Sequence, residues 1–145
     1  IQRFLVIIAA LLVAGLAIYL YAVLPVDAVV MRHNVERILK GDLSPSVQII
    51  VHPTTSEGIL QLVPLLECRD SVIREGVSAL LVKRQQDLQT VSVHRESSGW
   101  TARQIADEYL LDELGRIQTA LSDYRDQARR EAAIEEFREY AMQWF

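Results

Sequence analysis

The chain has 145 residues, 50% of them apolar and 23% charged, with a formal net charge of −4. This balance excludes a strongly basic nucleic-acid-binding surface, because binding along phosphates needs clustered lysines and arginines, and we expect no nucleic-acid partner. The single cysteine, Cys68, excludes an internal disulfide and agrees with a reducing compartment.

The amino-terminal part is dominated by Phe4–Leu24, which contains no charged residue. As a helix rising about 1.5 Å per residue, this run would cover the roughly 30 Å hydrocarbon core of a bilayer. It is longer than the roughly 7–15 apolar residues of a signal peptide, and a buried helix of a soluble protein usually carries a polar side. We therefore predict a transmembrane helix over residues 1–25 and a soluble helical domain over residues 26–145.

Small residues are grouped along the predicted span. Ala10, Ala14 and Ala17 recur at i, i+4 and i+7, and Gly15 follows Ala14. Small side chains let a second helix approach closely in lipid, so these four positions are candidates for membrane-helix packing. The alternative is that alanine is simply common in membrane helices.

Interface anchors and flanking charge suggest an orientation. Tyr19 and Tyr21 lie near the end of the span, where aromatic rings with a polar tip favour the membrane–water interface. Arg32 and Arg37 are further predicted anchors, because their charged ends can lie at headgroup level while their stems cover apolar surface. More bases follow the span than precede it, since Arg32, Arg37 and Lys40 stand against Arg3. The positive-inside rule then places the carboxy-terminal domain in the cytoplasm and the protein in the plasma (inner) membrane.

A short sequence pattern follows the span: Asp27-Ala28, then Asn34 and Arg37, and later Val63-Pro64-Leu65-Leu66. It resembles the C-terminal part of a family of bacterial multi-pass membrane proteins of unknown function. The resemblance covers roughly residues 20–83, and Ser44–Ser56 departs from it. It implies the tail of a larger membrane protein and no particular activity. Because the chain begins with Ile, we also expect residues before Ile1. Whether further membrane helices are among them is left open by the sequence.

Apolar residues at helical spacing predict a first domain helix over residues 28–40, capped by Asp27 and ending at Gly41. Residues 43–53 fit a short strand or a short helix, and the lack of a good partner strand favours the helix. The inward side chains of the helix over residues 28–40 are expected to be Ala28, Met31, Val35 and Ile38.

Thr54 and Glu57 form a capping box, which predicts a helix through Leu66 that bends at Pro64. A further helix, capped by Asp70 or Ser71, is expected to end near Leu88. Residues 86–99 are polar and predict an exposed loop or a small hairpin.

The last helical region begins at a second capping box, Thr101 with Gln104, with Trp100 placed to pack on Ile105. Apolar residues then recur at alternating spacings of four and three, as in a coiled coil. A second short series near the C-terminus is out of step, which predicts a bend or two helices. The residues predicted to contact a partner are Leu110, Leu114, Ile117, Leu121, Trp144 and Phe145. The alternative for the last two is that they close the domain core.

No residue pattern points to catalysis, a cofactor or a metal. His33, His52 and His94 lie far apart in the sequence. Glu108 and Asp112 lie one helical turn apart, but a metal site there would need matching carboxylates from another helix.

The expected fold class is therefore all-α: one transmembrane helix, then a small helical-bundle domain with a long C-terminal helical region. The expected function is that of a non-catalytic, membrane-anchored interaction or assembly subunit, whose partners are other membrane-protein subunits or a second copy of itself. The alternative is the structural or regulatory tail of a multi-pass transporter or sensor. An enzyme sharing a site with a partner through Glu108 or Asp112 is a third hypothesis.

Overall fold

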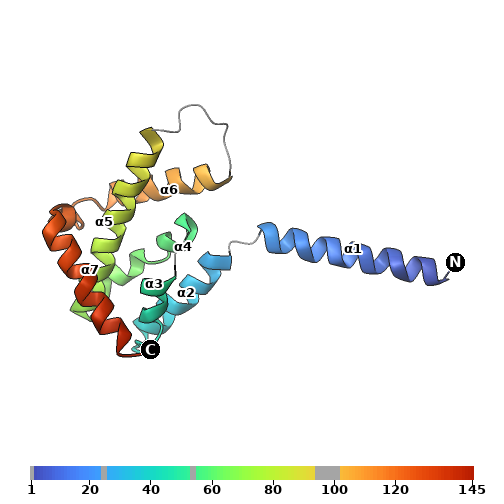
Figure 1. Ribbon diagram of the computed structural model, residues 1–145, viewed down its shortest axis with the longest axis horizontal. Helices are drawn as coiled ribbons and strands as arrows, with labels where there is room; N and C mark the ends of the chain where they lie inside the picture. The colour runs from blue at the N-terminus through green and yellow to red at the C-terminus, as the bar shows by residue number, and fades with distance from the viewer. Residues whose placement is uncertain (1, 24–25, 53–54, 94–101) are drawn as a thin grey trace.

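The computed structural model is built of helices throughout the residues that it describes (Figure 1). Its backbone is described over residues 2–23, 26–52, 55–93 and 102–145, and its side chains over 6–19, 26–52, 55–91 and 105–145. The predicted all-α class is confirmed. The elements are α1 (Gln2–Val23), α2 (Val26–Leu39), α3 (Ser46–Val51), α4 (Ser56–Leu60), η1 (Val63–Glu67), α5 (Ser71–Val93), α6 (Ala102–Arg116), η2 (Ser122–Arg125) and α7 (Gln127–Met142).

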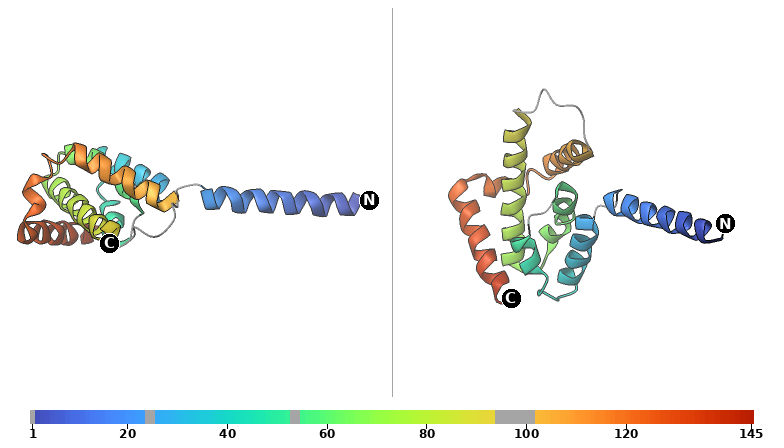
Figure 2. Two further views of the ribbon diagram at one scale, coloured as in Figure 1. Left: turned by 90° about the horizontal axis from the view of Figure 1, so that it is seen from above. Right: turned by 45° about the vertical axis from the view of Figure 1, so that its right-hand side comes forward.

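The first helix, α1, extends away from the other helices in all three views (Figures 1 and 2). Each of its described side chains, at residues 6–19, is exposed. Within the described parts of the chain, none of the helices has the length and apolarity needed to cross a membrane. The transmembrane helix over residues 1–25 stays a prediction from the sequence.

The other helices form a bundle around α5, as predicted. α5 packs most extensively along α7, and the two lie side by side in Figures 1 and 2. α4 packs against both α2 and α6, while η1 packs against α5. Apolar side chains from these helices share one core. Its most deeply buried large members are Ile38, Leu62, Leu65, Ile73, Val77, Leu81, Leu110, Leu114, Leu121 and Phe137.

Helix α2 ends where predicted but begins earlier than predicted. It starts at Val26, so Asp27, the expected N-cap, lies inside its first turn, and the cap prediction was wrong. Met31, Val35 and Ile38 are buried, and the helix ends before Gly41, whose φ of 95° is left-handed and therefore suits glycine. The Gly41 N–H donates to the Ile38 carbonyl at 2.9 Å, which closes the last turn. α3 confirms a helix rather than a strand within residues 43–53.

The segment after α3 differs from its prediction. α4 is only five residues long, and its cap is Thr55, whose Oγ1 accepts from the Gly58 N–H at 3.4 Å. Thr54, the expected cap, lies outside the described residues. A separate 3₁₀ helix, η1, then begins with Pro64 in its first turn. The single helix through Leu66 was a wrong prediction, because proline lacks an N–H and suits a helix start better than an interior.

Helix α5 starts as predicted and ends later. Asp70 caps it, since its Oδ1 accepts from the Ile73 N–H at 3.1 Å. The helix continues to Val93, so the loop predicted over 86–99 is wrong for residues 86–93. Buried Leu88 holds this polar turn against the core, and its described neighbours, residues 86, 87 and 89–91, are exposed, as on any solvated helix face. Residues 94–99 lie outside the described part.

The C-terminal region contains two α-helices, α6 and α7, with the short η2 between them, so the prediction of a bend or two helices is confirmed. The break lies earlier than predicted, because α6 ends at Arg116, inside the first apolar series and not after it. Asp126 starts α7 by accepting the Arg129 N–H on Oδ1 at 2.9 Å. Arg130 is buried, and its Nη1 donates to the carbonyls of Tyr124 at 3.1 Å and Arg125 at 3.2 Å. These bonds fix the angle between η2 and α7. Thr101 and Trp100, which were expected to begin the region, lie outside the described residues.

Candidate interaction surfaces

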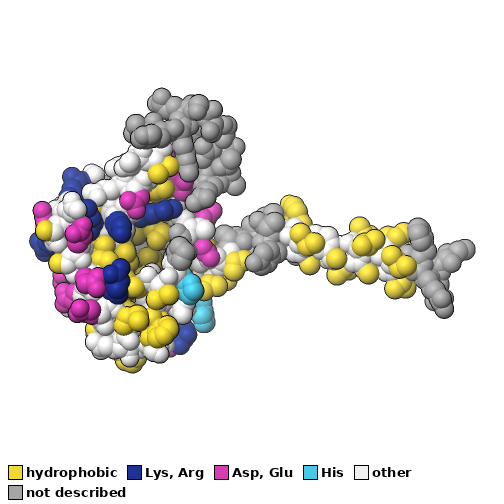
Figure 3. Space-filling model, viewed as in Figure 1, with side chains coloured by type: hydrophobic (Ala, Val, Ile, Leu, Met, Phe, Trp, Pro, Cys, Tyr) yellow, Lys and Arg dark blue, Asp and Glu magenta, His cyan; other side chains and the backbone are white. Residues whose placement is uncertain are grey.

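The apolar surface of α1 is fully available to a partner or to lipid. Figure 3 shows hydrophobic side chains along its described length, with Leu12 at 69% exposure and Ile18 at 70%. A Cβ placed on Gly15 would have no atom within 4 Å. The structure therefore leaves the predicted small-residue positions open. These positions, all exposed, are Ala10, Ala14, Gly15 and Ala17.

Of the two predicted aromatic anchors, Tyr19 is 62% exposed on α1. The side chain of Tyr21 lies outside the described residues.

The outward side of α2 begins with an apolar group that the sequence analysis missed. Val26, Val29 and Val30 are 46%, 61% and 52% exposed. They lie at i, i+3 and i+4 and therefore share one side of the first two turns. This spacing is visible in the sequence, beside the predicted stripe of Met31, Val35 and Ile38. The side chains that follow outward, Arg32 and His33, are exposed too.

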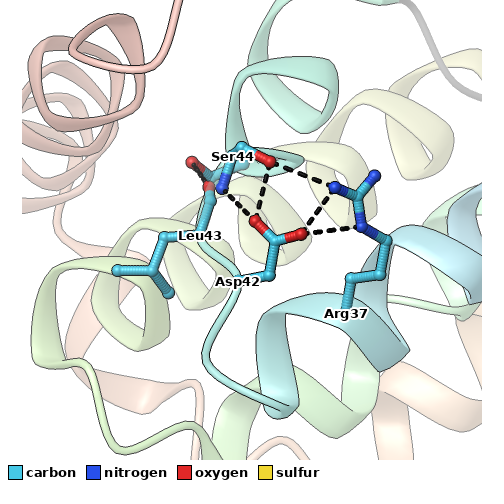
Figure 4. Close-up of polar contacts among 5 residues, drawn as sticks. Arg37, Asp42, Leu43 and Ser44 are labelled. Carbon is cyan, nitrogen blue, oxygen red and sulfur yellow. Dashed lines mark hydrogen bonds and ion pairs between the residues drawn. The ribbon is translucent and has the colours of Figure 1, made fainter.

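The two arginines predicted as anchors are held by local ion pairs. Arg32 Nε lies 3.2 Å from Glu36 Oε1, with the arginine side chain 74% exposed, so the pair contributes little stability. Arg37 turns toward the loop after α2, where its Nε donates to Asp42 Oδ2 at 2.9 Å and its Nη2 donates to Ser44 Oγ at 3.2 Å (Figure 4).

Asp42 is the centre of this loop. Its Oδ1 accepts the Ser44 hydroxyl at 2.7 Å and the Ser44 N–H at 3.2 Å (Figure 4). The hydrogen bond from the Ser44 side chain, followed by that from Arg37, lowers the pKa of the Asp42 carboxyl below its ordinary value. Arg37 therefore belongs to a self-contained polar turn that orders the end of α2.

The predicted partner-contact residues separate into two groups. Leu110, Leu114 and Leu121 are at most 1% exposed and form part of the core, and Ile117 packs partly buried against it. Helix α6, which carries Leu110 and Leu114, packs against the chain's own α4 and α5, so this part of the seam is not open to a partner. Trp144 and Phe145, at 48% and 89% exposure, remain open at the C-terminal end.

Helix α6 carries a second exposed apolar pair. Ile105 and Tyr109 lie one turn apart and are 60% and 57% exposed. The sequence analysis had assigned Ile105 to packing with Trp100, which lies outside the described residues. These two side chains are further candidates for contact with a partner.

A partly buried polar cluster at the start of α4 joins this helix to α2, α5 and α6. The Ser56 hydroxyl donates to Asp107 Oδ1 of α6, and it accepts from Arg84 Nη2 of α5 at 3.3 Å. The backbone N–H of the preceding residue, Thr55, donates to Asp27 Oδ2 of α2 at 3.2 Å. Because the Ser56 hydroxyl is engaged both as donor and as acceptor, we assign this cluster a structural role.

The described residues show no group of three or more His, Cys, Asp and Glu side chains that could hold a metal. Asp112 pairs with Arg116 Nη2 at 2.7 Å, and Glu108 is exposed. His33 and His52 are exposed on separate elements. His94 lies outside the described part of the chain.

A surface hollow of about 630 Å³ lies between the end of α2 and the turn before α5. Asp70, in its lining, accepts from the Ile73 N–H and from the Tyr140 hydroxyl at 2.7 Å. Charges of both signs are mixed in this lining, so we assign it no ligand. The lining residues are Ile38, Leu39, Lys40, Gly41, Leu43, Glu67, Cys68, Arg69 and Asp70.

Comparison with known proteins gives no relative. No family model, no curated protein and no solved structure matches this chain. The resemblance of Asp27-Ala28 and Val63-Pro64-Leu65-Leu66 to bacterial multi-pass membrane proteins stays a prediction from the sequence.

Proposed function

We propose that this protein is a non-catalytic, membrane-anchored interaction or assembly subunit of a larger membrane complex. Phe4–Leu24 anchors it, and residues 26–145 form its helical domain, on the cytoplasmic side of a bacterial plasma (inner) membrane. Other membrane-protein subunits or a second copy of the chain are its partners.

One observation carries the proposal: α1 exposes apolar side chains around its whole circumference. Leu11, Leu12 and Val13 point in three different directions and are 68%, 69% and 68% exposed. Such a helix is stable only where lipid or other apolar helices surround it, because in water this much apolar surface drives association. The uncharged sequence run supports lipid as part of that surrounding.

The proposed contact between subunits uses the small-residue side of α1. Ala10, Ala14 and Ala17 would let a second helix approach closely, and packing of this kind drives helix association in lipid. Trp144, Phe145, Ile105 and Tyr109 offer exposed apolar contacts on the domain, and aromatic residues are favoured at the centres of interfaces.

The test is chemical crosslinking and co-purification of the full chain from membranes in a mild detergent. We expect a defined complex with itself or with another membrane protein, and Ala14→Leu should weaken it because the added bulk separates the helices. Leu12→Phe is the matched control, since it adds bulk on the opposite side of α1. A monodisperse monomer without a partner would contradict the proposal, and a complex unchanged by Ala14→Leu would remove the small-residue side from it.

A second candidate is that the chain is the structural or regulatory tail of a multi-pass transporter or sensor. It is favoured by the residues that resemble such proteins, Asp27-Ala28, Asn34 and Arg37, directly after the predicted span. The sequence of the full-length gene separates the two candidates. Several hydrophobic spans encoded before Ile1 would favour the tail, and their lack would favour the single-span subunit.

A further inference from the structure

The exposed side chains on the outward side of α2 change from apolar to polar along the helix. Val26, Val29 and Val30, in the first two turns, are 46%, 61% and 52% exposed. Further along the same side, the exposed residues are His33 and Arg37. An α-helix that only covered a domain core would ordinarily carry polar residues along its whole outer side. Of the large apolar side chains exposed on α2, Leu39, at 47%, lies at the far end, and the three valines lie at the end nearest α1.

The chain itself keeps these valines close to α1. α1 ends at Val23 and α2 begins at Val26. The Cα atoms of Val23 and Val26 therefore lie at most about 11 Å apart, whatever path the chain takes between them. The interfacial layer on each side of a bilayer is roughly 5–8 Å thick. If α1 is anchored in lipid, the valine group is within reach of that layer.

Core packing fixes which way the valines point. Met31, Val35 and Ile38 hold the opposite side of α2 in the core, and Asp27 ties its first turn to α4 by accepting the Thr55 N–H at 3.2 Å. The helix therefore cannot rotate the valines inward without exposing three core residues.

We propose that this valine group (Val26, Val29 and Val30) lies on the bilayer surface and seats the domain against the membrane. The inference rests on the proposed anchoring by α1 and adds a defined lipid contact of the domain itself. We assign lipid as the partner of the valine group, because a bilayer that holds α1 brings its interfacial layer close to these side chains.

The nearby charges indicate an apolar contact rather than attraction to anionic headgroups. Arg32 is paired with Glu36 at 3.2 Å, and Asp27 adds a negative charge in the first turn. Since the surrounding charges are mixed, we expect the contact in bilayers of zwitterionic phosphatidylcholine, without anionic lipid and with little dependence on salt.

The test measures spin-label accessibility on the full chain in phosphatidylcholine vesicles. Labels are placed singly by Val29→Cys, Lys40→Cys and Leu12→Cys, and collisions with oxygen, which concentrates in lipid, are compared with those of a water-soluble nickel complex. Lys40 is the matched control, because it is exposed and directly follows Leu39, the last residue of α2, at the end farthest from α1. Leu12 reports on α1 alone.

Native Cys68 is buried. The three cysteine substitutions are made in a Cys68→Ala parent chain, so that only the introduced cysteine is labelled, and circular dichroism checks that this parent folds like the natural chain. If it does not fold, the substitutions are made in the natural chain, and labelling of the unsubstituted chain measures how much label Cys68 takes up.

We expect the oxygen-to-nickel collision ratio to be high at Leu12 and several-fold higher at Val29 than at Lys40. A high ratio at Leu12 with equal ratios at Val29 and Lys40 would overturn the lipid contact and leave the anchor intact. Few collisions with either reagent at Val29 would mean that protein covers it, which also overturns the inference. A low ratio at Leu12 would instead contradict the proposed anchoring, and the inference with it.

Discussion

Gly76 of α5 lies directly against Phe137 of α7, and a Cβ atom on Gly76 would overlap the side chain of Phe137. Phe137 is completely buried at this crossing. The close approach of the two helices that pack most extensively therefore depends on a residue without a side chain.

Gly76→Ala should destabilise the domain. Overpacking a filled core costs about 1–3 kcal/mol in the free energy of unfolding, which outweighs the gain of up to about 1 kcal/mol from replacing glycine in a helix. Chemical denaturation in detergent, followed by circular dichroism, measures the change. Gly115→Ala is the matched control, because a Cβ there meets open space, and it should leave stability unchanged or raised. Equal stability of the two variants would contradict the tight crossing.

The hydrogen bond from Tyr140 to Asp70 joins α7 to the start of α5, and it should matter most at alkaline pH. This bond, followed by burial, raises the pKa of Tyr140 above its ordinary value of 10.0. A tyrosine with a raised folded-state pKa stabilises the fold fully below the unfolded-state pKa, and this contribution is lost as pH rises through the folded-state pKa.

Tyr140→Phe should therefore lower the free energy of unfolding by about 1 kcal/mol near pH 7 and reduce the loss of stability above pH 10. Denaturation at a series of pH values, with an absorbance titration of tyrosinate, checks both effects. Exposed Tyr109 supplies the control, since Tyr109→Phe should leave stability at pH 7 unchanged. An unaltered alkaline profile in Tyr140→Phe would show that the bond to Asp70 does not form.

Ser44→Ala should raise the pKa of Asp42 toward 3.8, because the hydrogen bond from the Ser44 side chain is the largest cause of its lowering. A carboxyl with a lowered folded-state pKa contributes stability above its unfolded-state pKa, and this is lost as pH falls through the lowered value. An NMR titration of the Asp42 carboxyl carbon measures the pKa. Ser44→Thr keeps the hydroxyl and should keep the pKa low, so equal values in the two variants would contradict the geometry of this loop.

Val13→Arg should release the chain from membranes. Val13 lies near the middle of the apolar run and is 68% exposed on α1, and an arginine near the centre of a span costs roughly 2.5–3.5 kcal/mol on insertion. We expect a smaller fraction of the protein in the membrane pellet after an alkaline carbonate wash. Val13→Leu is the control and should stay in the pellet. Equal retention of both variants would contradict anchoring by α1.

Local signals in the sequence predicted the elements that depend on neighbouring residues. The periodic Met31, Val35 and Ile38, the terminal Gly41 and the capping side chain of Asp70 were each read correctly, because a cap or an amphipathic turn needs only residues a few positions away. Two apolar series that do not share one helical register predicted more than one helix in the C-terminal region, but not where α6 ends, because Arg116 lies within the first series.

The sequence by itself determined that the chain is helical, that one helix ends at Gly41 and another begins near Asp70, and that the chain begins with an apolar run. Only the tertiary structure decided which apolar residues are core and which are surface. Leu110, Leu114 and Leu121 fit a partner-binding seam by spacing, yet they are buried in the chain's own core. Val26, Val29 and Val30 have the same helical spacing and stay exposed. Periodicity shows that side chains share a side of a helix, but which side is covered depends on segments distant in the sequence, as the Gly76–Phe137 crossing shows.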